Sequence, residues 1–163
     1  MGQSAEKLIR EAREAILSAL GVRAREGELV FTSCGTEASA LAILGSAHAK
    51  ERRDAIRILT SDSEHPSVLN NILALEKEGF SVTYVGVDNC GVVKMDELRD
   101  AITEKTAIVA IMYANNEIGT IEPIEEICEI AHSKGALMFT DAVQAVGNVD
   151  IDLSKLKVDM LEE

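Results

Sequence analysis

Residues 28–43 read ELVFTSCGTEASALAI, and the organisation of the whole chain follows from this stretch. The short apolar run Leu29–Phe31 predicts a β-strand, and the Ala-, Leu- and Ile-rich residues after position 37 predict a helix. Small polar residues separate the two. A strand that ends in such a turn and opens a helix leaves backbone N–H groups unpaired at the positive end of the helix dipole. The stretch therefore predicts an anion site.

Two interpretations of this turn are open. Ser33 and Thr36 carry hydroxyl groups of the kind that bind a phosphate. Either hydroxyl would equally serve as the N-cap of an ordinary core helix, because Ser and Thr are favoured at that position. Taken alone, the stretch favours the helix cap, since caps are far more common than phosphate sites.

The composition excludes several classes of protein. The 163 residues are enough for one domain with a buried core, and 47% of them are hydrophobic. Three Phe, two Tyr and no Trp leave few rings for stacking on single-stranded nucleic acid. The net charge of -12 repels phosphate backbones and anionic membranes. We therefore expect binding to neither nucleic acid nor membranes.

Compartment and metal content follow from the remaining composition. No stretch approaches the ~18 apolar residues of a membrane-spanning helix, and the first 14 residues are polar rather than typical of a signal peptide. Cys34, Cys90 and Cys128 are far apart and lack the paired spacing of zinc or redox sites. These features predict a cytoplasmic protein with reduced thiols and no metal site.

Beyond the opening stretch, helical and extended patterns alternate. Helices are predicted over 4–20, from the turn to about residue 50, over 66–78, 96–102 and 123–134, and strands over 56–60, 81–87, 107–112 and 136–139. The tail, 149–161, has room for one more short strand. Several strands are apolar throughout, which is typical of a parallel sheet buried on both faces, so the predicted fold class is α/β.

Four polar clusters follow predicted strands, at 33–37, 63–66, 115–119 and 140–144. In open α/β sheets, ligands bind beyond the carboxyl ends of the strands. Each cluster also has a purely structural explanation, such as a surface loop, turn geometry or a helix cap. Four clusters at neighbouring strand ends nevertheless favour a binding site.

The chemistry that these clusters share suits pyridoxal 5'-phosphate, as one option among several. A phosphate at the first helix, a ring lying against His65 and a buried carboxylate at Asp141 would hold its parts. The carboxylate would keep the pyridine nitrogen protonated, which makes the ring an electron sink. Asn116 and Gln144 would hydrogen-bond the phenolic oxygen of the ring.

Four segments carry a family resemblance: FTSCGTE at 31–37, EHPSVL at 64–69, ANNEIGT at 114–120 and TDAVQAVG at 140–147. In order and spacing they resemble the cysteine desulfurases, pyridoxal-phosphate enzymes of the class V aminotransferase group. The resemblance covers nearly the whole chain. It implies a three-layer α/β/α architecture with a mostly parallel central sheet, as in the large domain of fold-type I pyridoxal-phosphate transferases. Residues 1–163 would then form a single, partial domain.

The resemblance implies six cofactor-binding residues: Gly35, Thr36, His65, Asn116, Asp141 and Gln144. The first two would hold the phosphate. His65, also the implied catalytic residue, would stack on the ring, and Asp141 would pair with the pyridine nitrogen. The two amides would lie near the phenolic oxygen.

The implied activity is removal of sulfur from L-cysteine, leaving alanine, with the sulfur passed as a persulfide to an acceptor or scaffold protein for iron–sulfur cluster or thio-cofactor assembly. Relatives work as homodimers. The chain departs from the family at Cys34, where Gly is usual, and that side chain would crowd the phosphate turn.

The family lysine that forms the Schiff base falls after the last residue, and neither Lys155 nor Lys157 matches it. No cysteine here matches the family's persulfide cysteine. We therefore expect this chain to be inactive alone. The alternative is a non-catalytic domain of the same fold that binds pyridoxal phosphate or phosphate, or serves as a scaffold.

Overall fold

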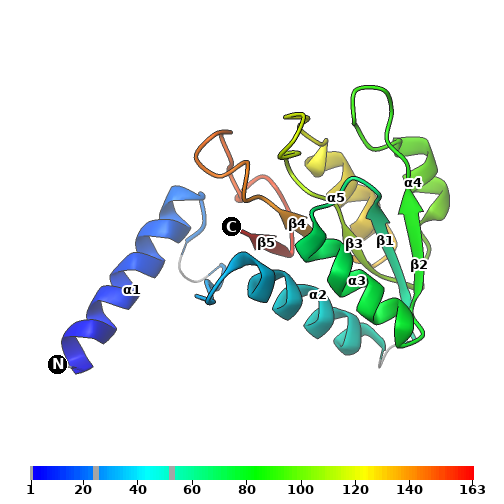
Figure 1. Cartoon of the computed structure of the whole chain (residues 1–163). Coiled ribbons are helices and arrows are strands. Elements are labelled where there is room, and N and C mark those ends of the chain that lie inside the picture. The colour runs from blue at the N-terminus through cyan, green and yellow to red at the C-terminus, as the bar shows by residue number, and fades with distance from the viewer. Residues whose placement is uncertain (1, 24–25, 52–53) are drawn as a thin grey trace.

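A five-stranded parallel sheet forms the centre of the protein (Figure 1). The computed structural model describes residues 2–23, 26–51 and 54–163. Within these, the strands are β1 (Arg57–Ser61), β2 (Ser81–Val85), β3 (Thr106–Ala110), β4 (Leu137–Asp141) and β5 (Met160–Glu162). Their order is β2-β1-β3-β4-β5, and every neighbouring pair is parallel. The predicted α/β class is confirmed, including the short strand in the tail.

Helices cover both faces of the sheet (Figure 1). The helices are α1 (Gly2–Ala19), α2 (Gly35–Glu51), α3 (Pro66–Lys77), α4 (Met95–Ala101) and α5 (Ile124–Ser133). Side chains of α2 and α3 pack in one apolar cluster with alternate residues of the strands, such as Ile108. Side chains of α4 and α5 pack in a second cluster with the residues between them, such as Val109. Two apolar layers on opposite faces give the expected three-layer architecture.

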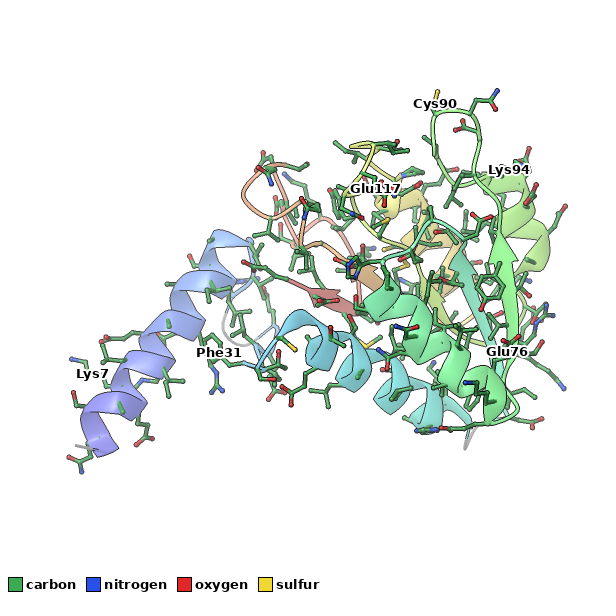
Figure 2. The ribbon with its side chains drawn as sticks, viewed as in Figure 1. Lys7, Phe31, Glu76, Cys90, Lys94 and Glu117 are labelled. Atoms are coloured by element: carbon green, nitrogen blue, oxygen red, sulfur yellow. The ribbon has the colours of Figure 1, made fainter. Side chains whose placement is uncertain are left out.

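The prediction of a strand at Leu29–Phe31 is wrong. These residues pair with no strand among the described residues, and the sheet has β2 and β5 at its two edges. Val30 is 56% exposed, and so is much of Phe31, which is labelled in Figure 2. The guanidinium of Arg13 lies 5.5 Å from the ring centroid of Phe31. An apolar β-prone run becomes a strand only where a partner offers backbone hydrogen bonds, and here the run contacts α1 instead.

Helix α1 is where predicted, but it buries no residue and extends away from the sheet (Figure 1). Leu8, on its predicted apolar face, is 64% exposed. None of the helices in the described ranges is long and apolar enough to cross a membrane.

The order of the strands indicates where on the sheet a ligand would bind. From β1 the chain first adds β2 on one side and then returns to add β3 on the other, so the order reverses between β1 and β3. In doubly wound sheets the crevice at such a reversal, beyond the carboxyl ends of the strands, is where ligands bind. The loops after β1, β3 and β4 therefore converge on one position.

Candidate functional site

One cavity, here called the strand-end cavity, lies at this position and has a volume of about 360 Å³. It is lined by all six residues predicted from the sequence: Gly35, Thr36, His65, Asn116, Asp141 and Gln144. They come from the start of α2, the end of β4 and the segments that follow β1, β3 and β4. The same cavity is thus lined by residues that are far apart in the sequence, up to the 109 positions between Gly35 and Gln144. Cys34 does not line this cavity but lines an adjoining groove, which shares Gly35 with it.

At the start of α2, neither residue predicted as a cap fills that position. The helix begins at Gly35, and the N–H groups of Glu37 and Ala38 donate to the carbonyl of Cys34. The Ser33 hydroxyl donates to the Glu37 carboxylate at 2.7 Å, and the Ser33 N–H donates to the same oxygen at 2.6 Å. Such a return contact from the first turn resembles a capping box. The Ser33 hydroxyl is therefore engaged, and of these two residues only Thr36 lines the cavity.

His65 is both the N-cap of α3 and a cavity residue. Its Nδ1 accepts the Ser67 N–H at 3.2 Å and lies 2.7 Å from the Ser67 hydroxyl oxygen. Because Nδ1 acts as the acceptor, a neutral His65 ring carries its proton on Nε2. The sequence left His65 open as a surface loop residue, a neighbour of a cap or a residue that stacks on a ring. The cap uses only Nδ1, so capping is compatible with ring stacking.

Asp141 ends β4 at the base of the cavity and is 6% exposed. Its Oδ1 accepts the Val143 N–H at 3.1 Å, and its carbonyl accepts the Tyr113 N–H at 2.8 Å. One backbone N–H thus holds the carboxylate, and another holds the main chain of Asp141. A carboxylate with so little exposure favours a cationic partner, because that partner offsets the loss of its hydration.

The two asparagines of the loop after β3 have different roles. Asn115 Oδ1 accepts the N–H groups of Glu117 and Ile118 at 2.9 and 3.1 Å, and its Nδ2 donates to the Ser63 carbonyl at 3.3 Å. Asn115 therefore builds the turn, as one alternative in the sequence held, and joins the loops after β1 and β3. Asn116 is exposed and lines the cavity.

Sequence reasoning missed Glu64, the residue before His65. Glu64 is 5% exposed, and its Oε1 accepts the Met112 N–H at 2.9 Å and the Ser61 hydroxyl at 2.7 Å. Its Oε2 has no hydrogen-bond partner among the described residues. Burial raises the pKa of Glu64 to about 8, so the group is largely protonated at neutral pH. The unusual state of Glu64 follows from its burial, and no local sequence pattern predicts that burial.

Sequence reasoning also missed Glu162, which ends β5 and lines the same cavity. It is 4% exposed, and the Ser39 hydroxyl donates to its Oε2. Burial raises the pKa of Glu162, and the charge of Asp141 raises it further. A signal was present in the sequence: the strand-end rule that selected Asp141 applies equally to the end of the tail strand.

The residues of this cavity fit the pyridine ring of pyridoxal phosphate. At the start of α2, where the phosphate would bind, they fit less well. Asp141 offers the buried carboxylate that a protonated pyridine nitrogen needs. The start of α2 offers backbone N–H groups, but the Glu162 carboxyl lies beside them. No lysine or arginine of the described residues lines the cavity. Lys155 lies elsewhere, 2.9 Å from Asp152.

Comparison with known proteins agrees with this geometry. The family model described as aminotransferase class-V matches residues 1–162. The chain belongs to the class-V aminotransferase family. Members of this family depend on pyridoxal 5'-phosphate, so the six residues of the strand-end cavity are candidates for its contacts.

Several relatives of this class-V chain are cysteine desulfurases. The chain is 48% identical over 161 residues to the cysteine desulfurase IscS of Methanosarcina thermophila, covering 99% of this chain and 39% of that protein. Among solved structures, a NifS-like protein superposes with a TM-score of 0.90 at 41% identity, over 97% of this chain and 43% of the other. A structure described as SspA in complex with cysteine gives 0.90 at 36% identity, over 98% and 45%. The chain spans about two fifths of the length of the curated relatives it matches.

Proposed function

We propose that this chain is the cofactor-binding part of a cysteine desulfurase, which removes sulfur from L-cysteine and leaves alanine. One observation carries the proposal: all six residues expected to contact pyridoxal phosphate line one cavity at the strand ends. Relatives described as cysteine desulfurases support the reaction, and SspA, described in complex with cysteine, supports the substrate. When bound, the cofactor supplies an electron sink for bond cleavage at the amino acid.

The residues of the chain have distinct tasks in this proposal. Asp141 holds a proton on the pyridine nitrogen, because a buried carboxylate is stabilised by a cation at hydrogen-bond distance. His65 packs its ring face against the cofactor and excludes water from that side. Its Nδ1 is held by Ser67, which fixes the orientation of the ring.

Two amides and the start of α2 complete the proposed contacts. Asn116 and Gln144 donate side-chain N–H groups to the phenolic oxygen, which orients the ring in its plane. The phosphate binds the backbone N–H groups and the Thr36 hydroxyl at the start of α2. No side chain of this arrangement is a cation, so phosphate affinity depends on the helix terminus rather than on an ion pair.

Equilibrium dialysis of the 163-residue chain with pyridoxal 5'-phosphate tests the proposal. We expect saturable binding, weakened about tenfold or more by Asp141→Asn, because a hydrogen bond to a charged group contributes roughly 1.5–3 kcal/mol. Asp150→Asn is the matched control, since Asp150 is an exposed aspartate that lines another cavity.

Absence of saturable binding, or equal loss in both variants, would exclude the strand-end cavity as the cofactor site. Borohydride reduction of the same samples separates covalent from non-covalent binding. A single trapped lysine would show that a lysine of this chain reaches the cofactor.

A second candidate is a non-catalytic pyridoxal-phosphate-binding domain. It is favoured by the absence of lysine from the cavity wall among the described residues. The two candidates differ in the reduction experiment, because purely non-covalent binding leaves every lysine unmodified.

Partners and assembly belong to the same proposal. We infer a homodimer that passes sulfur to an acceptor or scaffold protein in the cytoplasm. The exposed apolar side chains of α1 and of the segment after it support self-association, with Leu8 64% and Phe31 49% exposed. Sedimentation of the chain as a monomer at high concentration would contradict the dimer.

A further inference from the structure

A carboxyl group occupies the place where the proposed function needs a phosphate. Glu162 lies so close to Gly35 that its Oε1 would clash with a Cβ added to that glycine. The Ser39 hydroxyl, on the first turns of α2, donates to the other oxygen of the same carboxyl. With 4% exposure, Glu162 is held within the strand-end cavity at the start of α2.

We propose that Glu162 competes with the cofactor's phosphate for the start of α2, so that a phosphate monoester binds there only as Glu162 takes up a proton. The inference rests on the proposed function and names the residue that decides when that site accepts its ligand. A carboxylate and a phosphate dianion side by side in a buried position repel each other strongly, because the effective dielectric constant there is low. A neutral carboxylic acid instead donates a hydrogen bond, which the phosphate accepts.

The charges around Glu162 give no compensation for a second anion. Three ionisable groups line the same cavity as Glu162: His65 from the start of α3, Asp141 from β4 and Glu163 from its own strand end. Two of these three are acids. Glu37 is already engaged with Ser33, which leaves Glu162 as the carboxyl nearest Gly35.

The direction of the pH dependence follows from the environment of the carboxyl. Burial raises the pKa of Glu162 above the ordinary range of a glutamate. Below that pKa the acid is neutral and compatible with phosphate. Above it, each phosphate bound requires one proton, so affinity falls by up to tenfold for each pH unit.

Calorimetric titration with pyridoxine 5'-phosphate and with pyridoxine tests this coupling. Neither ligand has an aldehyde, so reaction with lysine does not interfere. At pH 8 we expect Glu162→Gln to bind the phosphorylated ligand about tenfold more tightly than the unmodified chain, and pyridoxine equally well. The amide keeps the shape of the side chain and still accepts the Ser39 hydroxyl. Proton uptake on binding, measured in buffers of different ionisation enthalpy, should be lower in Glu162→Gln.

Glu163→Gln is the matched control, because it removes one charge from the neighbouring residue of the same cavity wall. An equal gain in both variants would show only general charge repulsion and overturn the proposal. Unchanged or weaker binding by Glu162→Gln would overturn it as well.

Failure of the proposed function has a different signature, in which neither pyridoxine compound binds any variant. Thermal unfolding in inorganic phosphate then decides the inference. Stabilisation of Glu162→Gln, but not of the unmodified chain, supports competition at the start of α2. Absence of stabilisation in both overturns it.

Discussion

The strand-end cavity and a larger cavity beside α5 are both acidic, but most carboxylates of the larger cavity are exposed to water. The larger one, here called the α5 cavity, has a volume of about 610 Å³ and is lined by Glu125, Glu129, Asp150 and other acids. These three are exposed to water. In the strand-end cavity, by contrast, Asp141 and Glu162 are 6% and 4% exposed.

This difference separates a candidate site from an acidic surface. Exposed carboxylates keep their hydration, so a cluster of them needs no ligand. Buried carboxylates lose hydration, and protonation, hydrogen bonds or a bound cation must offset the free energy that this costs. The strand-end cavity has two such buried carboxyls, Asp141 and Glu162, whereas in the α5 cavity Glu122 is buried and accepts the Val93 N–H.

The largest expected effect concerns Glu64, whose pKa burial raises to about 8 from 4.5. Between those values the native state holds a proton that the unfolded chain releases, so stability falls as pH rises. We expect a slope of up to ~1.4 kcal/mol per pH unit between pH 5 and 8 in urea unfolding. Glu64→Gln should flatten it.

Glu125→Gln is the control from the α5 cavity and should leave that slope unchanged, because Glu125 is exposed. A wild-type slope equal to that of Glu64→Gln would show that Glu64 is ionised in the native state.

An intermediate effect is expected where a serine donates to a carboxyl in each cavity. Ser39 donates to Glu162 and is fully buried, whereas Ser154 donates to Asp152 and is exposed. Ser39→Ala should lower the free energy of unfolding by about 1–3 kcal/mol, because it leaves a buried acceptor unpaired. Ser154→Ala should change it by less than about 0.5 kcal/mol, since water replaces the lost donor. Equal losses in urea unfolding would remove the distinction between the cavities.

The smallest effect is a shift in titration rather than in stability. The Ser154 hydroxyl and the Lys155 ammonium lower the pKa of Asp152 to about 2, whereas burial raises the pKa of Glu162. We expect carboxyl NMR titration to place the two groups on opposite sides of their ordinary ranges. Ser154→Ala should raise the Asp152 pKa and leave the Glu162 titration unchanged. A Glu162 pKa below its ordinary value would contradict the account of the strand-end cavity.

The sheet and the six cavity residues could be predicted because both depend on short-range patterns. Apolar runs predicted β1, β3 and β4, and the strand-end rule then selected polar residues that the parallel topology brings together. The family resemblance supplied their individual roles. His65 shows a further reason for success, since the cap that positions it is formed with Ser67, only two residues away.

The rest depended on contacts between distant parts of the chain. The run at Leu29–Phe31 has strong β-propensity, but a strand requires a partner and propensity does not supply one. Buried Glu64 accepts a hydrogen bond from Met112, 48 residues away in the sequence. Buried Glu162 accepts one from Ser39, 123 residues away. Local sequence gave no sign that either carboxyl would be protected from water.

The central claim, that the strand-end cavity is the ligand site, is tested most directly by NMR titration of the labelled chain with pyridoxine 5'-phosphate at pH 6. The predicted result is that amide signals of 35–36, 65, 116, 141–144 and 162 shift together with one dissociation constant. Signals of the α5 cavity, 122–129 and 150–156, should remain in place. Shifts confined to the α5 cavity, or absent from both cavities, would contradict the claim.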